Sequence, residues 1–445
     1  MDQLPRKLGT LDATMIVIGI VIGAGIFLLP NVMARSVPSG PGMLAIWVVA
    51  GVLSYFGALA FAELGAMMPA TGGHYVYMRE AFGPGAAFLC GWIFMLAVVP
   101  GGMAFLSVSF SIYLDQFIPL TPALRSVVSL GLLAVLAGAN YIGVKEGAWI
   151  QRIFTSLKIG GLLLIIGAAA MAPRAAGAAH DIARTVSYGG IGYALTACLM
   201  AYNGWSYVSF VAGEIKDPQR NLPRALALGM LAVGALYVSA NLAYLHVMTV
   251  PEIAATERVG AAVAGRTLGP GGAGLLAVVV LLSIVGAING NILTGARIPF
   301  AQARDGVFFA RFGRVHPRFE TPALAIVAGS IWTSILILTG SYETLFAYAM
   351  LSSWGFYTLG VLAVWVLRRK MPDAPRPYRM WGYPYSMLAF VLVSAWYMVD
   401  AIVNQPKTSL IALAVTAAGV PFYLIFRAQA RAAEETPPVR PEVVS

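Results

Sequence analysis

Long apolar runs recur along the whole chain, and they constrain its fold more than any other feature. A run of about 18 or more apolar residues is long enough to cross a bilayer as a helix. The charge content agrees, because only 11% of the residues are charged, against roughly 25% in ordinary globular proteins. The sequence therefore predicts an all-α polytopic membrane protein with twelve transmembrane helices, at 12–35, 42–68, 85–114, 123–141, 149–171, 187–213, 222–248, 272–302, 322–340, 343–367, 384–403 and 408–427.

No long polar segment separates these runs, so residues 1–430 are expected to form a single transmembrane domain. The first run lacks the polar n-region and cleavage site of a signal peptide, and it is expected to be retained as a span. Residues 431–445, with their Glu and Pro content, are predicted to be a disordered cytoplasmic tail.

The basic residues predict the orientation. A net charge of +10 is compatible with nucleic-acid binding, but most Lys and Arg lie in or beside the inner loops that a cytoplasmic N-terminus would create. This positive-inside bias predicts that both termini are cytoplasmic and that the protein is a multi-pass protein of the cell (inner) membrane. The basic clusters are interpreted as topology determinants and contacts to lipid headgroups, and no nucleic-acid partner is expected.

Gly23-Ala24-Gly25 lies in the middle of the first apolar run and favours a break in that helix. A broken backbone at membrane depth must face protein or a water-filled cavity. The free amides of the second half-helix suit an anion, and the free carbonyls of the first half suit a cation. An α-amino acid carries one charge of each sign, so this segment is interpreted as a socket for a zwitterion.

A second interruption lies in the sixth run, where Asn203 and Gly204 stand at membrane depth. Five spans separate the two breaks, and because five is odd, two five-helix repeats must have opposite orientations. Inverted repeats with discontinuous first helices are typical of a class of secondary transporters. The predicted repeats cover about 12–171 and 187–367, followed by extra helices within 384–427. The alternative is close helix packing alone, since Gly19 and Gly23 also form a small-xxx-small pattern.

Four segments carry a resemblance to a known family: IGAGIF at 22–27, AELGAMMPATGGHYVYMREAFGP at 62–84, AYNGWSYVSFVAGEIKDPQRNLPRAL at 201–226, and GAINGNILTGARIPFAQARDG at 286–306. Over about residues 8–425 the chain resembles the amino acid–polyamine–organocation superfamily, and within it the L-type amino acid transporters. The resemblance implies two inverted five-helix repeats plus two helices, with helices 1 and 6 discontinuous.

The resemblance also implies that substrate binds between the two breaks. The amides around Ala24, Gly25 and Ile26 would hold the carboxylate, and carbonyls of both breaks would hold the ammonium, namely those of Val21, Met200, Ala201 and Asn203. The expected substrate-binding set is Val21, Ile22, Gly23, Ala24, Gly25, Ile26, Met200, Ala201, Tyr202, Asn203, Gly204 and Trp205.

Departures from the family pattern bear on the substrate. Relatives commonly have Ser at the position of Ala24, and many have an aromatic gate at Met200 and Gly at Asn203. No carboxylate lies near either break to receive a cationic side chain, since Glu214 falls about two and a half turns past the second. Small or medium neutral amino acids are therefore expected, with a broader or cationic specificity as the alternative. His74 replaces the usual Asp and receives no role.

Lys158 lies near the middle of the predicted span 149–171, and charged residues inside membranes are functional candidates. It matches a lysine of sodium-independent relatives, whose ammonium occupies the space of a sodium ion. Snorkelling to the interface is the alternative, but about ten residues separate Lys158 from either end of the span. The resemblance favours sodium-independent exchange over proton-coupled symport. Possible gate residues are Glu63, Arg297 and Trp354.

Other functional classes find little support. The sequence lacks the paired acid and base or the Ser-Lys pair of an intramembrane enzyme, and it lacks the polar rings of a channel. No cofactor or metal ligand set is evident. Cys90 and Cys198 lie within predicted spans, and the loop at 115–125 has no cysteine, so no disulfide-linked heavy chain is expected. The expected partners are an amino acid substrate and the lipid bilayer.

Overall fold

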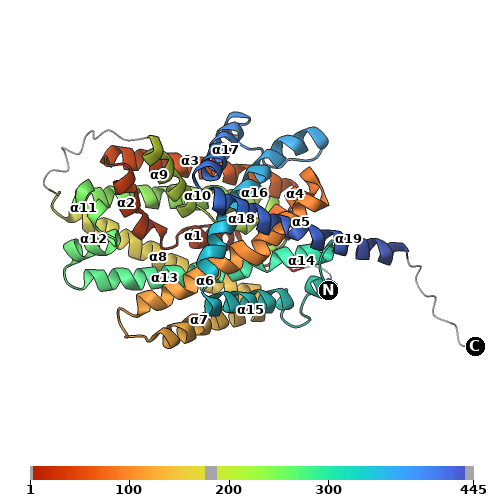
Figure 1. Ribbon diagram of the computed structural model, residues 1–445, viewed down its shortest axis with the longest axis horizontal. Helices are drawn as coiled ribbons and strands as arrows, with labels where there is room; N and C mark the ends of the chain where they lie inside the picture. The colour runs from red at the N-terminus through yellow and green to blue at the C-terminus, as the bar shows by residue number, and fades with distance from the viewer. Residues whose placement is uncertain (1–3, 176–187, 436–445) are drawn as a thin grey trace, which may run out of the picture.

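A computed structural model describes residues 4–175 and 188–435 of the chain. These residues form helices joined by short loops (Figure 1). The helices of the N-terminal half are α1 (Thr10–Val21), α2 (Gly25–Ser36), α3 (Gly40–Met67), α4 (His74–Phe82), α5 (Pro84–Ile93), the π-helix η1 (Phe94–Val98), α6 (Val99–Leu114), α7 (Pro122–Ile142), α8 (Val144–Met171), α9 (Tyr188–Ala201) and the 3-10 helix η2 (Trp205–Glu214).

The remaining helices are α10 (Pro218–Val247), α11 (Val250–Ala255), α12 (Val259–Leu268), α13 (Gly272–Gly295), α14 (Arg297–Arg304), the 3-10 helix η3 (Ala310–Gly313), α15 (Ala323–Thr339), α16 (Tyr342–Lys370), α17 (Tyr385–Asn404), α18 (Pro406–Ala417) and α19 (Gly419–Glu435). Because α19 runs to Glu435, the first residues of the predicted tail are helical. Residues 436–445 of that tail, and residue 187 at the start of the second predicted repeat, lie outside the described residues.

Within the described residues, nine continuous helical segments are long and apolar enough to cross a membrane, or ten if the bent pair α1 and α2 forms one span. Three of these segments join helices that carry separate labels: α5, η1 and α6; α13 and α14; and α18 with most of α19. This confirms a multi-pass helical membrane protein, whereas the twelve spans stay a prediction. Two of the twelve predicted spans are not among these ten. The predicted span 187–213 is divided between α9 and η2, and in the predicted span 322–340 the helix α15 has only 17 residues. A 3-10 helix in the second half of the sixth run was not expected from its sequence.

Both predicted breaks are present. The axes of α1 and α2 differ by 43° across a gap of three residues. The second break separates α9 from η2, and Gly204 at its end has a φ of 108°. A side chain is strained in that left-handed region, so glycine is the residue that permits the turn there.

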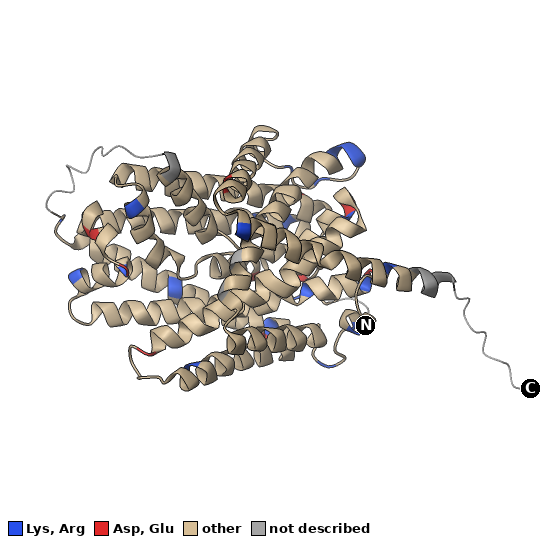
Figure 2. Cartoon of the chain, viewed as in Figure 1, with Lys and Arg blue, Asp and Glu red and all other residues tan. Residues whose placement is uncertain are grey.

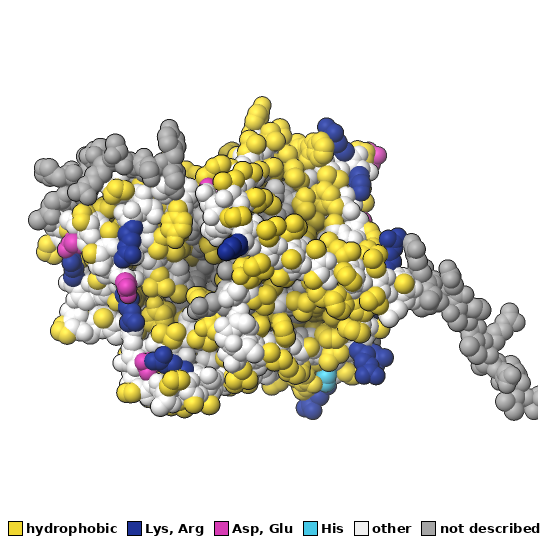
Figure 3. Space-filling model, in the orientation of Figure 1, with side chains coloured by type: hydrophobic (Ala, Val, Ile, Leu, Met, Phe, Trp, Pro, Cys, Tyr) yellow, Lys and Arg dark blue, Asp and Glu magenta, His cyan; other side chains and the backbone are white. Residues whose placement is uncertain are grey.

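The half-helix α1 lies at the centre of the bundle, packed against α8, α10 and α13. The helices α3 and α10 pack along each other, and α6 lies against α13 on one side and α7 and α15 on another. Charged side chains are sparse on the helices in Figure 2, and much of the face in Figure 3 is hydrophobic. An exposed apolar surface of this extent suits a protein surrounded by lipid.

Candidate functional site

The two breaks lie side by side in the bundle. A Cβ atom built on Gly25 would lie 3.5 Å from the Cβ of Ala201, so the start of α2 touches the end of α9. Amides in the first turn of a helix have no intrahelical acceptor, and this applies to α2 at Gly25 and Ile26. The amides expected to hold a carboxylate therefore border the carbonyls at the end of α9.

Tyr237 on α10 joins the two breaks, although it is not among the residues predicted from the sequence. Its hydroxyl lies 2.9 Å from the carbonyl oxygen of Val21 and 3.1 Å from that of Ala201. Both carbonyls belong to the set expected to hold the ammonium. The Met200 carbonyl, also in that set, accepts a hydrogen bond from the Asn203 amide at 3.1 Å. A hydroxyl at membrane depth was the available signal, since such a group needs a partner.

Lys158 on α8 is buried beside the first break. Its Nζ donates to the carbonyl oxygens of Gly19 at 2.8 Å, Ile22 at 2.7 Å and Ser283 at 2.9 Å. The Ser283 hydroxyl on α13 also donates to the Ile22 carbonyl, at 2.8 Å. The ammonium therefore connects α8 and α13 to the broken end of α1, and all three of its protons are bonded.

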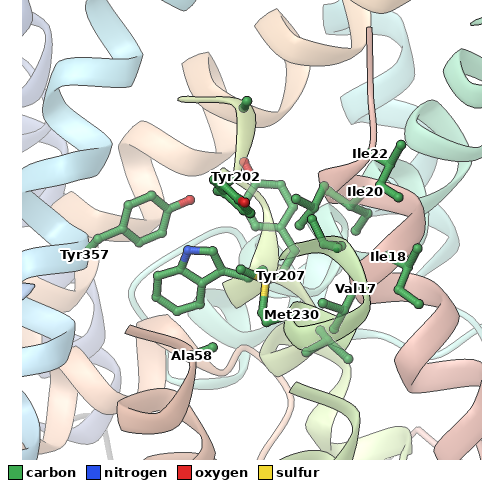
Figure 4. Close-up of a cluster of buried hydrophobic side chains, with 14 of the residues drawn as sticks. Val17, Ile18, Ile20, Ile22, Ala58, Tyr202, Tyr207, Met230 and Tyr357 are labelled. Atoms are coloured by element: carbon green, nitrogen blue, oxygen red, sulfur yellow. The ribbon is translucent and has the colours of Figure 1, made fainter. Parts of the chain in front are cut away.

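The side chains of the second break are engaged with neighbouring helices. Asn203 accepts a hydrogen bond from the Tyr357 hydroxyl at 2.8 Å, and its amide nitrogen lies 3.2 Å from the Met350 sulfur. Tyr202 is buried and donates to the Trp47 carbonyl. In Figure 4, Tyr357 points from α16 toward the segment that carries Tyr202.

Trp205 and Met200 have opposite environments. Trp205 is buried, with its ring edge-on to Phe61 and tilted against Tyr357. Met200 is 40% exposed. Of the two side chains, only Met200 is accessible from outside the bundle.

The three possible gate residues are not brought together. Arg297 pairs with Glu214 through two N–O contacts of 2.7 Å, and both side chains are almost fully buried. Glu63 instead accepts two hydrogen bonds from Arg368, at 2.8 and 2.7 Å. Trp354 is buried, and its ring stacks on Phe390. The two ion pairs join residues far apart in the sequence, so local patterns gave no indication of them.

The N-terminal end of α1 is fastened to the end of η2. The Leu8 amide donates to the Glu214 carbonyl at 2.9 Å, and the Lys216 amide donates to the Leu8 carbonyl at 2.8 Å. Asp12 on α1 pairs with Arg152 on α8 at 3.0 Å. Together with the Arg297–Glu214 pair, these contacts tie the start of α1 and the end of η2 to α8 and α14.

His74 begins α4, which is not one of the candidate spans. Its Nε2 lies 2.9 Å from the Phe356 carbonyl oxygen, its Nδ1 has no partner, and its ring stacks on Tyr357. Burial lowers the pKa of His74 to about 4, although the contact with the Phe356 carbonyl acts in the opposite direction. The imidazole is therefore neutral near pH 7.

Within residues 4–175 and 188–435, no group of three or more His, Cys, Asp or Glu residues could hold a metal ion. Cys90 and Cys198 are both free and buried.

Comparisons with known proteins agree on one family. A family model described as amino acid permease matches residues 8–420. The chain is 31% identical over 438 residues to the human b(0,+)-type amino acid transporter 1, covering 95% of this chain and 88% of the relative. It is 30% identical over 429 residues to the serine/threonine exchanger SteT of Bacillus subtilis (strain 168), covering 95% and 97%.

A third relative is the human large neutral amino acids transporter small subunit 2, which is 32% identical over 439 residues, covering 95% of this chain and 80% of the relative. These relatives are named as transporters or exchangers, and none is named as an enzyme. The resemblance drawn from the four sequence segments is thereby confirmed, and the chain belongs to the amino acid permease family of the amino acid–polyamine–organocation superfamily.

Proposed function

We propose that this protein is a secondary transporter that exchanges L-amino acids across the cell membrane by alternating access. The observation that carries the proposal is the meeting of two broken helices, with Lys158 bonded to the carbonyls of the first. Helix breaks of this kind supply both polarities that a zwitterion needs. The names of its relatives, an amino acid transporter and a serine/threonine exchanger, support an amino acid substrate and exchange.

In the proposed binding mode, the first turn of α2 at Ala24, Gly25 and Ile26 holds the carboxylate. The ammonium approaches the carbonyls of Val21 and Ala201, which share the single hydroxyl proton of Tyr237 as acceptors. A carbonyl oxygen has two lone pairs, so the Ala201 carbonyl can accept from a substrate ammonium while keeping the tyrosine. The Val21 carbonyl also accepts from the Gly23 amide at 2.9 Å, so an ammonium there would displace one of its two donors. Tyr237 would then hold the two breaks at the spacing that one amino acid fits.

Neutral amino acids of small or medium size are the proposed substrates, because no unpaired carboxylate borders the two breaks in the described part of the chain. Glu214 is already paired with Arg297, so it does not offer a free carboxylate to a cationic side chain. Asn203 is the polar side chain at the second break, and it could turn from Met350 to a substrate hydroxyl or amide. A broader or cationic specificity is the alternative, and uptake of a panel of labelled neutral and cationic amino acids distinguishes the two.

Lys158 would act as a fixed cation in place of a sodium ion, which makes exchange independent of sodium. Its three hydrogen-bond partners are the carbonyl oxygens of Gly19 and Ile22 at the first break and of Ser283 on α13. The symport alternative requires the same ammonium to lose and regain a proton during each cycle. A neutral amine would make fewer of these charge-assisted hydrogen bonds, so α1 would be released.

We also infer the architecture of the family for this chain: twelve spans within residues 1–430, as two inverted repeats at about 12–171 and 187–367 plus helices within 384–427. Both termini would be cytoplasmic. The pairing of α3 with α10 supports the repeats, since these helices are the second members of the two predicted repeats. No disulfide-linked heavy chain is part of the proposal.

The test is uptake of labelled amino acids into liposomes that contain the purified protein. Exchange requires an unlabelled amino acid inside, and uptake should not change when sodium or a proton gradient is imposed. Lys158→Ala should strongly impair uptake, because it removes the cation that links α8 and α13 to α1. Lys145→Ala, at an exposed position of the same helix, is the control that should transport normally.

Accumulation in empty liposomes driven by an inward proton gradient would overturn exchange in favour of symport. Non-saturable flux without stimulation by internal amino acid would instead indicate a channel.

A further inference from the structure

A cavity of about 140 Å³ lies away from the two breaks, between α6, α13 and α15. We call it the α6–α15 cavity. Its walls include Val99, Ile292 and Ala325, all of which are buried. Its rim includes Met95 and Gly329, which are half-buried, so the cavity opens at the outside of the bundle.

The cavity is left unfilled because several of the residues that line it have small side chains. Glycine and alanine line it at positions where larger side chains would fill it, and a Cβ atom added to Gly329 would meet no atom within 4 Å. On the other side, the π-helix η1 shifts the helix register, and the Leu96 carbonyl there accepts a hydrogen bond from Trp332 on α15 at 2.7 Å. This bond joins η1 to α15 at one edge of the cavity.

An apolar ligand suits this cavity better than water does. A water molecule needs two or more polar partners, whereas apolar cavities of about 150 Å³ stay dry and accept a ligand of benzene size. The Ser330 hydroxyl, one of its few polar groups, is already bonded to the Ile326 carbonyl. At the surface of a membrane helix bundle, the apolar ligand at hand is a lipid acyl chain.

Basic side chains lie at one end of the cavity. Phe308 and Phe312 line it, and Phe312 belongs to η3, which also carries Arg311. Arg311 and Arg314 are exposed, and neither makes an ion pair with a carboxylate in the described part of the chain. The acidic residues that flank this loop are already paired, Asp305 with Arg79 and Glu320 with Lys7. Figure 3 shows dark-blue side chains at the lower right, at the edge of the yellow surface.

We propose that the α6–α15 cavity binds the end of one acyl chain of an anionic phospholipid of the inner leaflet, whose phosphate is held by Arg311 and Arg314. The chain end enters between α6 and α15, beside Gly329, and the headgroup lies at η3. Juxtamembrane arginines attract anionic lipids of the cytoplasmic leaflet. A lipid site of this kind is independent of amino acid exchange. It rests on one part of the proposed function, namely that the loop carrying Arg311 and Arg314 is cytoplasmic.

The test measures phosphatidylglycerol bound to the purified full-length protein by native mass spectrometry, with phosphatidylcholine of the same acyl chains as the neutral comparison. Phosphatidylglycerol should bind preferentially. Gly329→Leu should abolish that preference by filling the cavity, whereas Gly131→Leu, at an exposed and equally open position of α7, should keep it. Arg311→Ala with Arg314→Ala should weaken binding roughly 30-fold, at about one factor of five for each charge.

The matched control for charge is Arg220→Ala with Arg224→Ala, which removes two exposed arginines at the start of α10. It should retain phosphatidylglycerol. The proposal would be overturned if both double variants lost phosphatidylglycerol equally, or if Arg311→Ala with Arg314→Ala bound it as well as the wild type. If Gly329→Leu fails to fold, these two double variants alone decide the test. Displacement of the lipid by millimolar inorganic phosphate would also overturn it, because a free-anion site does not need the acyl chain.

Discussion

The buried pair of Arg297 and Glu214 permits a quantitative prediction. The two side chains are 2% and 0% exposed, and the guanidinium meets the carboxylate through two contacts of 2.7 Å. Removing one partner leaves an uncompensated buried charge, which costs about 3–5 kcal/mol. Replacing both with apolar residues of similar volume is close to neutral or stabilising. We therefore expect Arg297→Met and Glu214→Leu each to lower the free energy of unfolding by about 3–5 kcal/mol.

The double variant should be more stable than either single variant, because no charge is left buried. Unfolding in detergent, followed by tryptophan fluorescence against denaturant, measures all three. Arg266→Met is the matched control, since it breaks the exposed pair of Arg266 with Glu252 and should change stability by about 1 kcal/mol or less. Additive losses in the double variant would refute the reasoning, and so would a single variant as stable as the control.

Three further predictions concern Tyr237, the carboxylate of Glu252 on α11 and the topology. Tyr237→Phe should lower the free energy of unfolding by about 1 kcal/mol and slow exchange, because it removes the hydroxyl that bridges the two breaks. Hydrogen bonds from Arg266 and the Thr249 amide lower the pKa of Glu252 from 4.5 to about 2. The stabilisation from Glu252 should be complete above pH 4.5 and disappear as the pH falls toward 2, so the difference in melting temperature between wild type and Glu252→Gln should narrow over that window. Single cysteines in the 115–125 loop should react with an impermeant thiol reagent added outside, whereas one near Arg311 should stay protected, and the reverse pattern would contradict the orientation.

The parts of the fold that depend on local sequence could be predicted. Both helix breaks were predicted, because Gly23 and Gly204 weaken a helix wherever they occur in it. The apolar runs predicted the long helices, since their length and hydropathy are local properties. Lys158 was singled out because a charge at membrane depth requires partners.

The contacts that assemble the site could not be predicted in the same way. The sequence shows only that Glu214 lies past the second break, whereas the fold pairs it with Arg297, which lies far along the chain. Tyr237 in α10 resembles an ordinary core aromatic in sequence, and only the packing of α10 against α1 brings its hydroxyl to Val21. The 3-10 geometry of η2 was also missed, because helical periodicity does not separate it from an α-helix over so few residues.

The central claim is that one amino acid binds between the two breaks, and binding by the Gly25→Val variant tests it most directly. A Cβ atom at position 25 would lie 3.5 Å from the Cβ of Ala201, in ordinary contact, so the two further methyl groups of valine would occupy the space between the breaks. Gly160→Val is the control, since it makes the same change at an open, exposed position of α8. Titration calorimetry of the purified protein with a neutral L-amino acid should detect binding in the wild type and the control and none in Gly25→Val. Unchanged affinity in Gly25→Val would contradict the account.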